Sequence, residues 1–222
     1  MSNLFKDNIK KSLYEAQIKD LKNAINNNNL EKFLFSDTDK QAIKHSPDRT
    51  KCEGFNDNAT RGKGAEKRIC KCLFYKNMEG INRKCETCIL KNLYQLKDGK
   101  YKIINYEIPA YYSGNGIGEI DLVLSDGNEQ YATEVKPPVK VDTGNNEETL
   151  LRMIAEITTY TLGFKDGTYN KAIGFFENTA QYEEYNEQND NIIELLDLLN
   201  ISVFLFKETK INNTEFEIIK LR

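Results

Sequence analysis

Three β-rich runs follow one another between residues 101 and 136, and no helical pattern interrupts them. The runs are "YKIINYEIPAYY", "IGEIDLVL" and "EQYATEVK", and the turn sequences "SGNG" and "SDGN" separate them. Short connections of this composition join neighbouring antiparallel strands, and an Asp-Gly pair is a strong signal for a tight hairpin. The sequence therefore predicts a three-stranded antiparallel meander at the centre of the fold.

Helical and strand patterns lie on both sides of this meander. Residues 64–77 and 147–162 have apolar side chains at helical spacing, and Asn or Glu near the start of the second segment is expected to cap it. Residues 79–100 look like a cysteine-bearing loop that runs into a further helix. "KAIGFFE" and "ISVFLFKE" predict strands around the helix "NIIELLDLLN", and "EFEIIKLR" predicts an edge strand. The predicted order is α, β, β, β, α, β, α, β.

The chain has 222 residues, which is somewhat more than the commonest domain size, so we expect one full domain with an extension. Residues 3–27 have the spacing of an amphipathic helix, and residues 36–63 have the polar composition of a loop. We therefore expect a helical N-terminal extension and loop over residues 1–60. A core follows over residues 61–222, with a cysteine-bearing insertion at about residues 70–90.

The hairpin made by the second and third strands brings charged side chains together. Side chains alternate between the faces of a strand, so Glu134 and Lys136 point the same way. Asp121 lies in the middle of an apolar strand, where burying a carboxylate is costly unless a cation is its partner. Mg²⁺ takes carboxylate oxygens as ligands and keeps waters, one of which can become a nucleophile. Lys136 is then close enough to orient that water or to neutralise charge on a phosphate.

These residues are similar to the motifs of the PD-(D/E)XK nuclease superfamily, which includes restriction-endonuclease-like and RecB-like proteins. The resemblance is carried by "GEID" and by "EVK", and it covers about residues 62–180. It implies an α/β fold with a restriction-endonuclease-like core, in which helices flank a mixed sheet that contains the antiparallel meander. It also implies that Asp121 and Glu134 bind Mg²⁺ or Mn²⁺, and that Lys136 supports the attacking water in phosphodiester hydrolysis.

The same resemblance implies site residues on the helices before and after the meander. The superfamily commonly has a glutamate on the preceding helix, and "GKGAEKRI" places Glu66 there as a further metal ligand. Some RecB-like members have Gln and Tyr four residues apart on the helix after the lysine strand. This chain has Glu156 and Tyr160 in "AEITTY", so the Gln is replaced, and Arg152 lies one turn earlier. Arg152 and Tyr160 are the candidate substrate-binding residues.

Five cysteines suggest a second site. Cys70 and Cys72 in "CKC" and Cys85 and Cys88 in "CETC" are two short-spaced pairs that can converge on one ion. Zn²⁺ is the first candidate, and an iron–sulfur cluster, which certain RecB-like nucleases carry, is the second. Residues two apart on a helix diverge by about 200°, so a set in which Cys52 replaces Cys70 stays open. Free thiols in a reducing compartment are the remaining alternative.

The composition narrows the function further. His45 is the only histidine, which excludes histidine-rich metal sites, so carboxylates must carry any hydrolysis. The formal net charge is −3, so contacts with nucleic acid would come from local lysines at residues 61–68 and 136–140. No apolar run approaches the roughly 18 residues that span a bilayer, and the N-terminus has no secretory pattern. We expect a cytoplasmic protein without membrane segments.

The first functional hypothesis is a divalent-metal-dependent nuclease that hydrolyses DNA in restriction, repair or defence. An RNA nuclease on the same scaffold is an alternative that these residues do not separate from it. A non-catalytic module that binds nucleic acid or protein on a nuclease-like fold is another, although the intact acid, acid and lysine set argues against it. Endonuclease or exonuclease action, sequence specificity and the choice between monomer and homodimer stay open.

Overall fold

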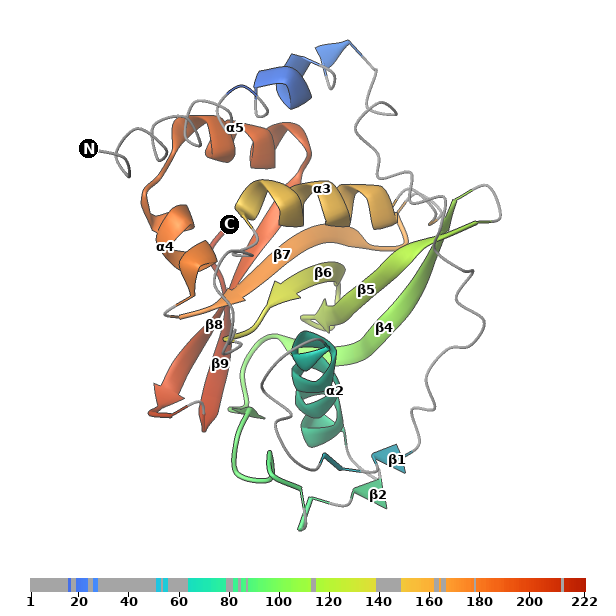
Figure 1. The fold of residues 1–222 in the computed structure, drawn as a ribbon, viewed down its shortest axis with the longest axis vertical. Helices are drawn as coiled ribbons and strands as arrows, with labels where there is room; N and C mark the ends of the chain where they lie inside the picture. The colour runs from blue at the N-terminus through green and yellow to red at the C-terminus, as the bar shows by residue number, and fades with distance from the viewer. Residues whose placement is uncertain are drawn as a thin grey trace, which may run out of the picture.

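A seven-stranded mixed sheet forms the centre of the molecule, and helices cover both of its faces (Figure 1). The computed structural model describes residues 16, 19–23, 26–27, 51–52, 54–55, 64–78, 82–83, 85–86, 88–112, 115–138, 149–161, 164, 167–177, 179–212 and 214–222. The sheet has the strand order β3-β9-β8-β7-β6-β5-β4, so strands that follow one another in sequence mostly lie side by side.

The predicted meander is present as β4 (Lys102–Tyr112), β5 (Asn115–Ser125) and β6 (Gln130–Lys136), paired antiparallel. The strand β7 (Asn170–Phe176) runs parallel to β6, and β8 (Ile201–Lys210) runs parallel to β7. The outer part of the sheet is β9 (Glu215–Lys220), antiparallel to β8, with the two-residue β3 (Gln95–Leu96) beside it. The prediction of a mixed sheet around a meander is confirmed.

The turn between β5 and β6 explains the register of the hairpin. One carboxylate oxygen of Asp126 accepts hydrogen bonds from the backbone N–H groups of Asn128 at 3.0 Å and Glu129 at 2.9 Å. Gly127 has a φ of 94°, a conformation that glycine adopts without steric cost. Because the turn is closed in this way, Ser125 faces Gln130, and the pairs from there to Leu122 with Thr133 follow in the same register.

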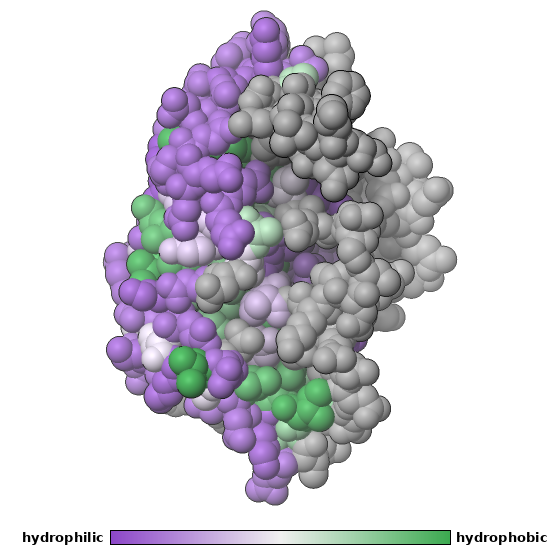
Figure 2. Space-filling view, turned by 60° about the vertical axis from the view of Figure 1, so that its left-hand side comes forward, coloured by the Kyte–Doolittle hydropathy of each residue, from purple (hydrophilic) through white to green (hydrophobic). Residues whose placement is uncertain are grey.

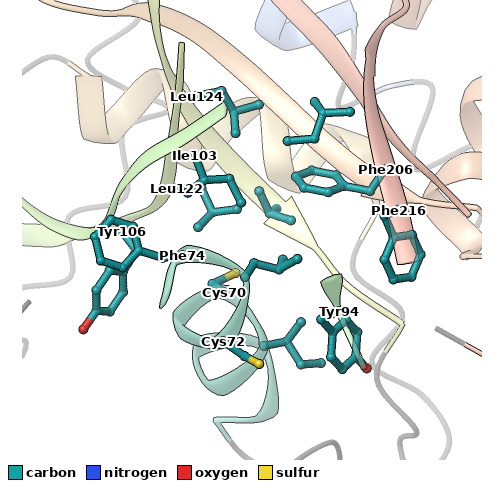
Figure 3. Close-up of a cluster of buried hydrophobic side chains, with 14 of the residues drawn as sticks. Cys70, Cys72, Phe74, Tyr94, Ile103, Tyr106, Leu122, Leu124, Phe206 and Phe216 are labelled. Atoms are coloured by element: carbon teal, nitrogen blue, oxygen red, sulfur yellow. The ribbon is translucent and has the colours of Figure 1, made fainter. Parts of the chain in front are cut away.

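The helices that flank the sheet in the described part of the chain include α2 (Ala65–Asn77), α3 (Leu150–Thr161), α4 (Ala180–Asn186) and α5 (Asp190–Leu198). The helix α2 lies on one face, whereas α3, α4 and α5 lie on the other (Figure 1). Strand β8 shows why both faces are covered, because Phe204 and Phe206 pack in the core with α2 while Val203 and Leu205 pack in the core with α3 and α5. The aromatic side of the core is drawn in Figure 3.

Two local features differ from those expected. The helix expected late in residues 79–100 is absent from its described residues, which form turns followed by β3. The helix α4 was not predicted, because only Gln181 and Tyr185 of its seven residues are buried and the segment has little apolar periodicity. The Asn and Glu residues expected to cap α3 lie outside the described residues, and the carbonyl and hydroxyl oxygens of Thr149 both accept the N–H of Arg152.

The N-terminal helix predicted over residues 3–27 lies mainly outside the described residues, as does the predicted loop over residues 36–63. Within residues 19–23 the chain is helical, and buried Leu21 joins the core that contains α3 and α5. Lys22 forms an ion pair with Glu194 of α5. No helix in the described ranges is both long and apolar enough to cross a membrane. The described residues on the face in Figure 2 are mainly hydrophilic, with apolar side chains in small groups.

Candidate active site

The strands β5 and β6 separate at Asp121, and this fork positions the predicted site. The last backbone pair between the two strands is Leu122 with Thr133. Beyond it, a carboxylate oxygen of Asp121 accepts a hydrogen bond from the backbone N–H of Val135 at 2.9 Å. The side chain therefore replaces the next strand contact and holds the divergent end of β6. Because side chains alternate along β6, Glu134 and Lys136 both turn to the side opposite Val135.

Lys136 is the central cation of the site. Its ammonium donates to Oε1 of Glu134 at 2.9 Å and to Oε2 of Glu66 at 3.4 Å, and it lies 3.8 Å from Oε2 of Glu156. Glu66 comes from α2, Glu134 from β6 and Glu156 from α3. One buried ammonium thus connects three carboxylates from three elements. The structure brings together all four residues predicted as catalytic: Glu66, Asp121, Glu134 and Lys136.

Burial makes the two strand carboxylates difficult to ionise together. The pKa of Glu134 is raised well above its ordinary value, first by burial and then by the charge of Asp121. The pKa of Asp121 is also raised by burial, although Lys136, the N–H of Val135 and a hydrogen bond with Glu134 oppose the shift. The two carboxyl groups are therefore in contact, and burial together with their mutual repulsion opposes the ionisation of both at once.

Four carboxylates lie close together in the site, those of Glu66, Asp121, Glu134 and Glu156, and Lys136 and Arg152 are among their cationic partners. Asp121 and Glu134 are buried, and a buried carboxylate is costly unless it is protonated or has a cation beside it. A bound cation would lower this cost.

The start of α2 places Glu66 at the open side of the site. Gly64 precedes the helix with a φ of 82°, which glycine adopts readily, and its carbonyl accepts the N–H of Arg68 at 3.2 Å. The Glu66 side chain is 42% exposed, compared with 6% for Glu134 and Lys136. The neighbouring Lys67 forms an ion pair with Glu119 of β5. Glu66 therefore lies at the solvent-exposed rim of the site, whereas Glu134 and Lys136 lie in its buried part.

The helix α3 provides the opposite wall. Arg152 donates to Oε1 of Glu156 at 3.1 Å, and its side chain is 52% exposed. Tyr160 is buried against Gly118, where an added Cβ would lie 2.1 Å from a ring carbon of the tyrosine. Burial, followed by the charges of Glu134, Glu156 and Asp121, raises the pKa of Tyr160, so its hydroxyl stays protonated. Arg152 can meet a ligand at the rim, whereas Tyr160 shapes the site from within.

Glu156 is the site residue that the sequence left without a role. Its side chain is 11% exposed, and its Oε2 is the one buried side-chain nitrogen or oxygen atom of the described residues that has no hydrogen-bond partner. Such an atom is costly unless something else supplies a donor or a cation. The signal in the sequence was its spacing, because Glu156 lies four residues before Tyr160 where RecB-like members often have Gln.

Asp121 and Glu134 are the residues of this site that could hold a hard divalent cation. Mg²⁺ in proteins is often held by one or two carboxylates and completes its coordination with waters and substrate phosphates. The ammonium of Lys136 lies 3.4 Å from Glu66 and 3.8 Å from Glu156. Within the described ranges, no three Cys, His, Asp or Glu side chains stand together as a ready set of metal ligands. The candidate metal ligands are therefore Asp121 and Glu134, on two neighbouring strands, with Glu66 and Glu156 close by.

The predicted cysteine sites separate into two environments along α2. Cys70 lies near the acidic site, because the charges of Asp121, Glu66 and Glu134 act on its thiol. Cys72 lies near Cys52, Cys85 and Cys88, whose charges act on it, and burial raises its pKa to about 12. Figure 3 shows Cys70 toward Leu122 of the sheet and Cys72 further along the helix toward Tyr94. The group around Cys72 matches the set that contains Cys52.

Comparisons with known proteins do not assign a family to this chain. No protein-family model and no curated protein matches the chain. The structure of Pyrococcus furiosus SfsA in complex with Ca²⁺ has 17% sequence identity and a TM-score of 0.27 to this chain. That likeness covers 55% of this chain and 53% of SfsA, so it spans about half of each protein. With so low a TM-score, it assigns neither a fold family nor a function to the chain described above.

Proposed function

We propose that this protein is a divalent-metal-dependent nuclease that hydrolyses phosphodiester bonds of DNA. The observation that carries the proposal is the buried contact of Asp121 with Glu134, beside the ammonium of Lys136. Two acids that resist joint ionisation, next to a lysine, have the composition of a site that exchanges a proton for a metal ion. The resemblance of "GEID" and "EVK" to the PD-(D/E)XK motifs supports the same reading.

In this proposal Asp121 and Glu134 hold Mg²⁺ or Mn²⁺, and Glu66 and Glu156 complete the acidic surround. When bound, the metal supplies Lewis acidity and lowers the pKa of a coordinated water. Val135 holds the Asp121 carboxylate in one orientation through its N–H, so this ligand does not have to be ordered during the reaction. Lys136 stabilises negative charge that develops on the phosphate, as a buried ammonium does with little reorganisation.

The exposed side of the site is suited to a polyanion. The side chains of Arg152 and Lys67 are 52% and 56% exposed, and they lie on α3 and α2 next to the buried acids. Their carboxylate partners, Glu156 and Glu119, are less exposed at 11% and 22%. Phosphate groups would therefore meet these two cationic side chains before their two carboxylate partners. Backbone contacts of this kind give affinity without sequence preference.

A cleavage assay tests the proposal. Linear duplex, circular duplex and single-stranded DNA, and RNA of the same sequence, are incubated with the protein in Mg²⁺, in Mn²⁺ or in chelator. The proposal predicts metal-dependent cutting of DNA by the native chain and a loss on the order of 100-fold or more in Asp121→Asn. If only RNA is cut, the protein is an RNA nuclease, and the assignment of the site residues is unchanged.

Asp126→Asn is the matched control for this assay. Asp126 lies in the same hairpin, and its oxygen that accepts from Asn128 and Glu129 can be replaced by the amide oxygen of Asn. This variant should cut at the native rate. If neither DNA nor RNA is cut under any metal condition by folded protein, or if Asp121→Asn cuts like the native chain, the assignment is wrong.

A further inference from the structure

The second group of reactive side chains in the molecule is the set of cysteines away from the acidic site. Cys52, Cys72 and Cys88 are each 5–7% exposed and belong to one buried cluster, and Cys85 is half-buried. Three separate parts of the chain supply these thiols: β1 (Lys51–Cys52), the helix α2 and the turns at residues 85–93. The proposed nuclease reaction uses none of them.

Backbone pairing brings the first and last of these segments together. The strand β1 pairs in parallel with β2 (Asn82–Arg83), and Cys52 is the register partner of Arg83, two residues before Cys85. The N–H of Ile89 donates to the carbonyl of Phe55 at 3.1 Å, which extends the contact to the other side of Cys88. Cys52 therefore lies beside the Cys85 and Cys88 turn although the two are far apart in sequence.

The turn itself has the form of a metal-binding loop. The N–H of Cys88 donates to the carbonyl of Cys85 at 3.2 Å, which closes a tight turn over the "CETC" spacing. The sulfur of Cys88 accepts the N–H of Phe55 at 3.2 Å and that of Leu90 at 3.4 Å. Two backbone N–H groups therefore point at this sulfur, and such donors would stabilise a thiolate bound to a metal ion.

The helix α2 is fixed to the same turn one helical turn after Cys72. The ammonium of Lys76 donates to the carbonyls of Leu90 at 2.5 Å and Lys91 at 3.0 Å, and also to that of Leu93. Cys72 and Lys76 are four residues apart and share one face of the helix. That face therefore looks toward the cysteine turn, whereas Cys70, about 200° away from Cys72, looks toward the acids.

We propose that Cys52, Cys72, Cys85 and Cys88 form a tetrathiolate site for Zn²⁺ that fixes β1 and the cysteine turn to α2. Cys52, Cys85 and Cys88 lie near Cys72, but the four described thiols do not form a closed ligand set, and the ion would draw them to Zn–S distances of about 2.3 Å. The role is structural, because four protein ligands leave no open position for a substrate. Cys70 is excluded by its side of the helix.

Elemental analysis of native protein expressed in zinc-containing medium is the first test. We expect about one zinc per chain, and we expect thiol alkylation at Cys52, Cys72, Cys85 and Cys88 to be slow until a strong chelator is added. Alkylation at buried Cys70 should not respond to the chelator. Replacement of the zinc by Co²⁺ should give the intense visible bands of a tetrahedral thiolate site.

Two variants complete the test. Cys88→Ser should lose the zinc, whereas Cys70→Ala should keep one equivalent, because the two residues lie on different sides of α2. If Cys88→Ser does not fold, the alkylation pattern and the Co²⁺ spectrum of the native chain decide. Native protein that contains no zinc, that contains iron with sulfide, or that loses zinc in Cys70→Ala would overturn the proposal. None of these results depends on nuclease activity.

Discussion

The carboxylate of Asp121 accepts the backbone N–H of Val135 at 2.9 Å, at the point where β5 and β6 stop pairing. Val135 stands between Glu134 and Lys136, so this hydrogen bond sets the position of both neighbours. Asp121 therefore has a structural role where the two strands separate and, in the proposed reaction, a second role as a metal ligand. Mutation can separate the two roles.

Asp121→Asn and Asp121→Ala should differ in stability and agree in activity. The amide oxygen of Asn can still accept the N–H of Val135, whereas Ala leaves that donor without its partner, a loss of about 1–3 kcal/mol in the free energy of unfolding. Both variants remove a metal ligand, so both should lose cleavage on the order of 100-fold or more. Urea unfolding measures the first effect. Equal stability of the two variants would show that the fork does not depend on this bond.

The stability of the metal-free protein should fall as pH rises. Burial and the charge of Asp121 raise the pKa of Glu134 above its ordinary value of 4.5, so the folded chain holds a proton that the unfolded chain releases. The stabilisation is complete below pH 4.5 and is lost as pH rises through the raised pKa. Thermal unfolding in chelator, from acidic to mildly alkaline pH, measures this dependence for the native chain and for Glu134→Gln.

Glu134→Gln has no proton to lose, so its profile should be flatter than that of the native chain over the same range. Mg²⁺ should stabilise the native chain more as pH rises, because the metal competes with the proton on Glu134. The variant should show little of this effect. Parallel pH profiles for the two proteins would contradict the raised pKa.

Gly118 should not tolerate a side chain. An added Cβ would lie 2.1 Å from the ring of Tyr160, and the φ of 153° also favours glycine. Gly127→Ala is the control, since its φ is 94° and no atom lies within 4 Å of the added Cβ. We expect Gly118→Ala to cost about 1–3 kcal/mol more than Gly127→Ala. In a Tyr160→Ala background this excess should disappear, and its persistence would mean that the ring contact is not the cause.

Glu156 should contribute to metal affinity through its charge. Glu156→Gln keeps an oxygen for the Arg152 hydrogen bond but removes the negative charge at Oε2, which accepts no hydrogen bond, so the Kd for Mg²⁺ should rise about 10-fold. Arg152→Gln is the control of opposite sign, because it removes a positive charge and should leave the Kd unchanged or lower it. Calorimetric titration measures both. A lower affinity in Arg152→Gln with no change in Glu156→Gln would reverse the assigned roles.

Much of the central sheet could be predicted because its signals are local. Alternation along β5 and β6 and the "SDGN" turn determine strand direction, register and the shared face of Glu134 and Lys136. The helix α4 escaped prediction because its burial depends on neighbours that lie far away in the sequence. Strands β1, β2 and β3 have two residues each, which is too short for a periodic pattern.

The sequence predicted which residues form the site better than it predicted the contacts between them. Strand parity placed Asp121 and Glu134 together, whereas the position of Lys136 between Glu66 and Glu156 depends on how α2 and α3 pack on the sheet. Residue 156 is Glu where some RecB-like members have Gln, so the sequence did not assign it as a fourth carboxylate of the site. The cysteines show the same limit, because the nearness of Cys52 to Cys72 arises from a pairing of distant segments.

The rate of duplex DNA cleavage by Lys136→Met at saturating Mg²⁺, with metal binding measured on the same preparation, tests the account most directly. Lys136 lies 2.9 Å from Glu134, so its removal should retain or tighten metal binding. Cleavage should nevertheless fall on the order of 100-fold or more, because the charge on the phosphate loses its stabilising ammonium. Lys100→Met, which removes the exposed partner of Asp126, should cut like the native chain. Native-like cutting by Lys136→Met, or no metal-dependent cutting by the native chain, would contradict the account.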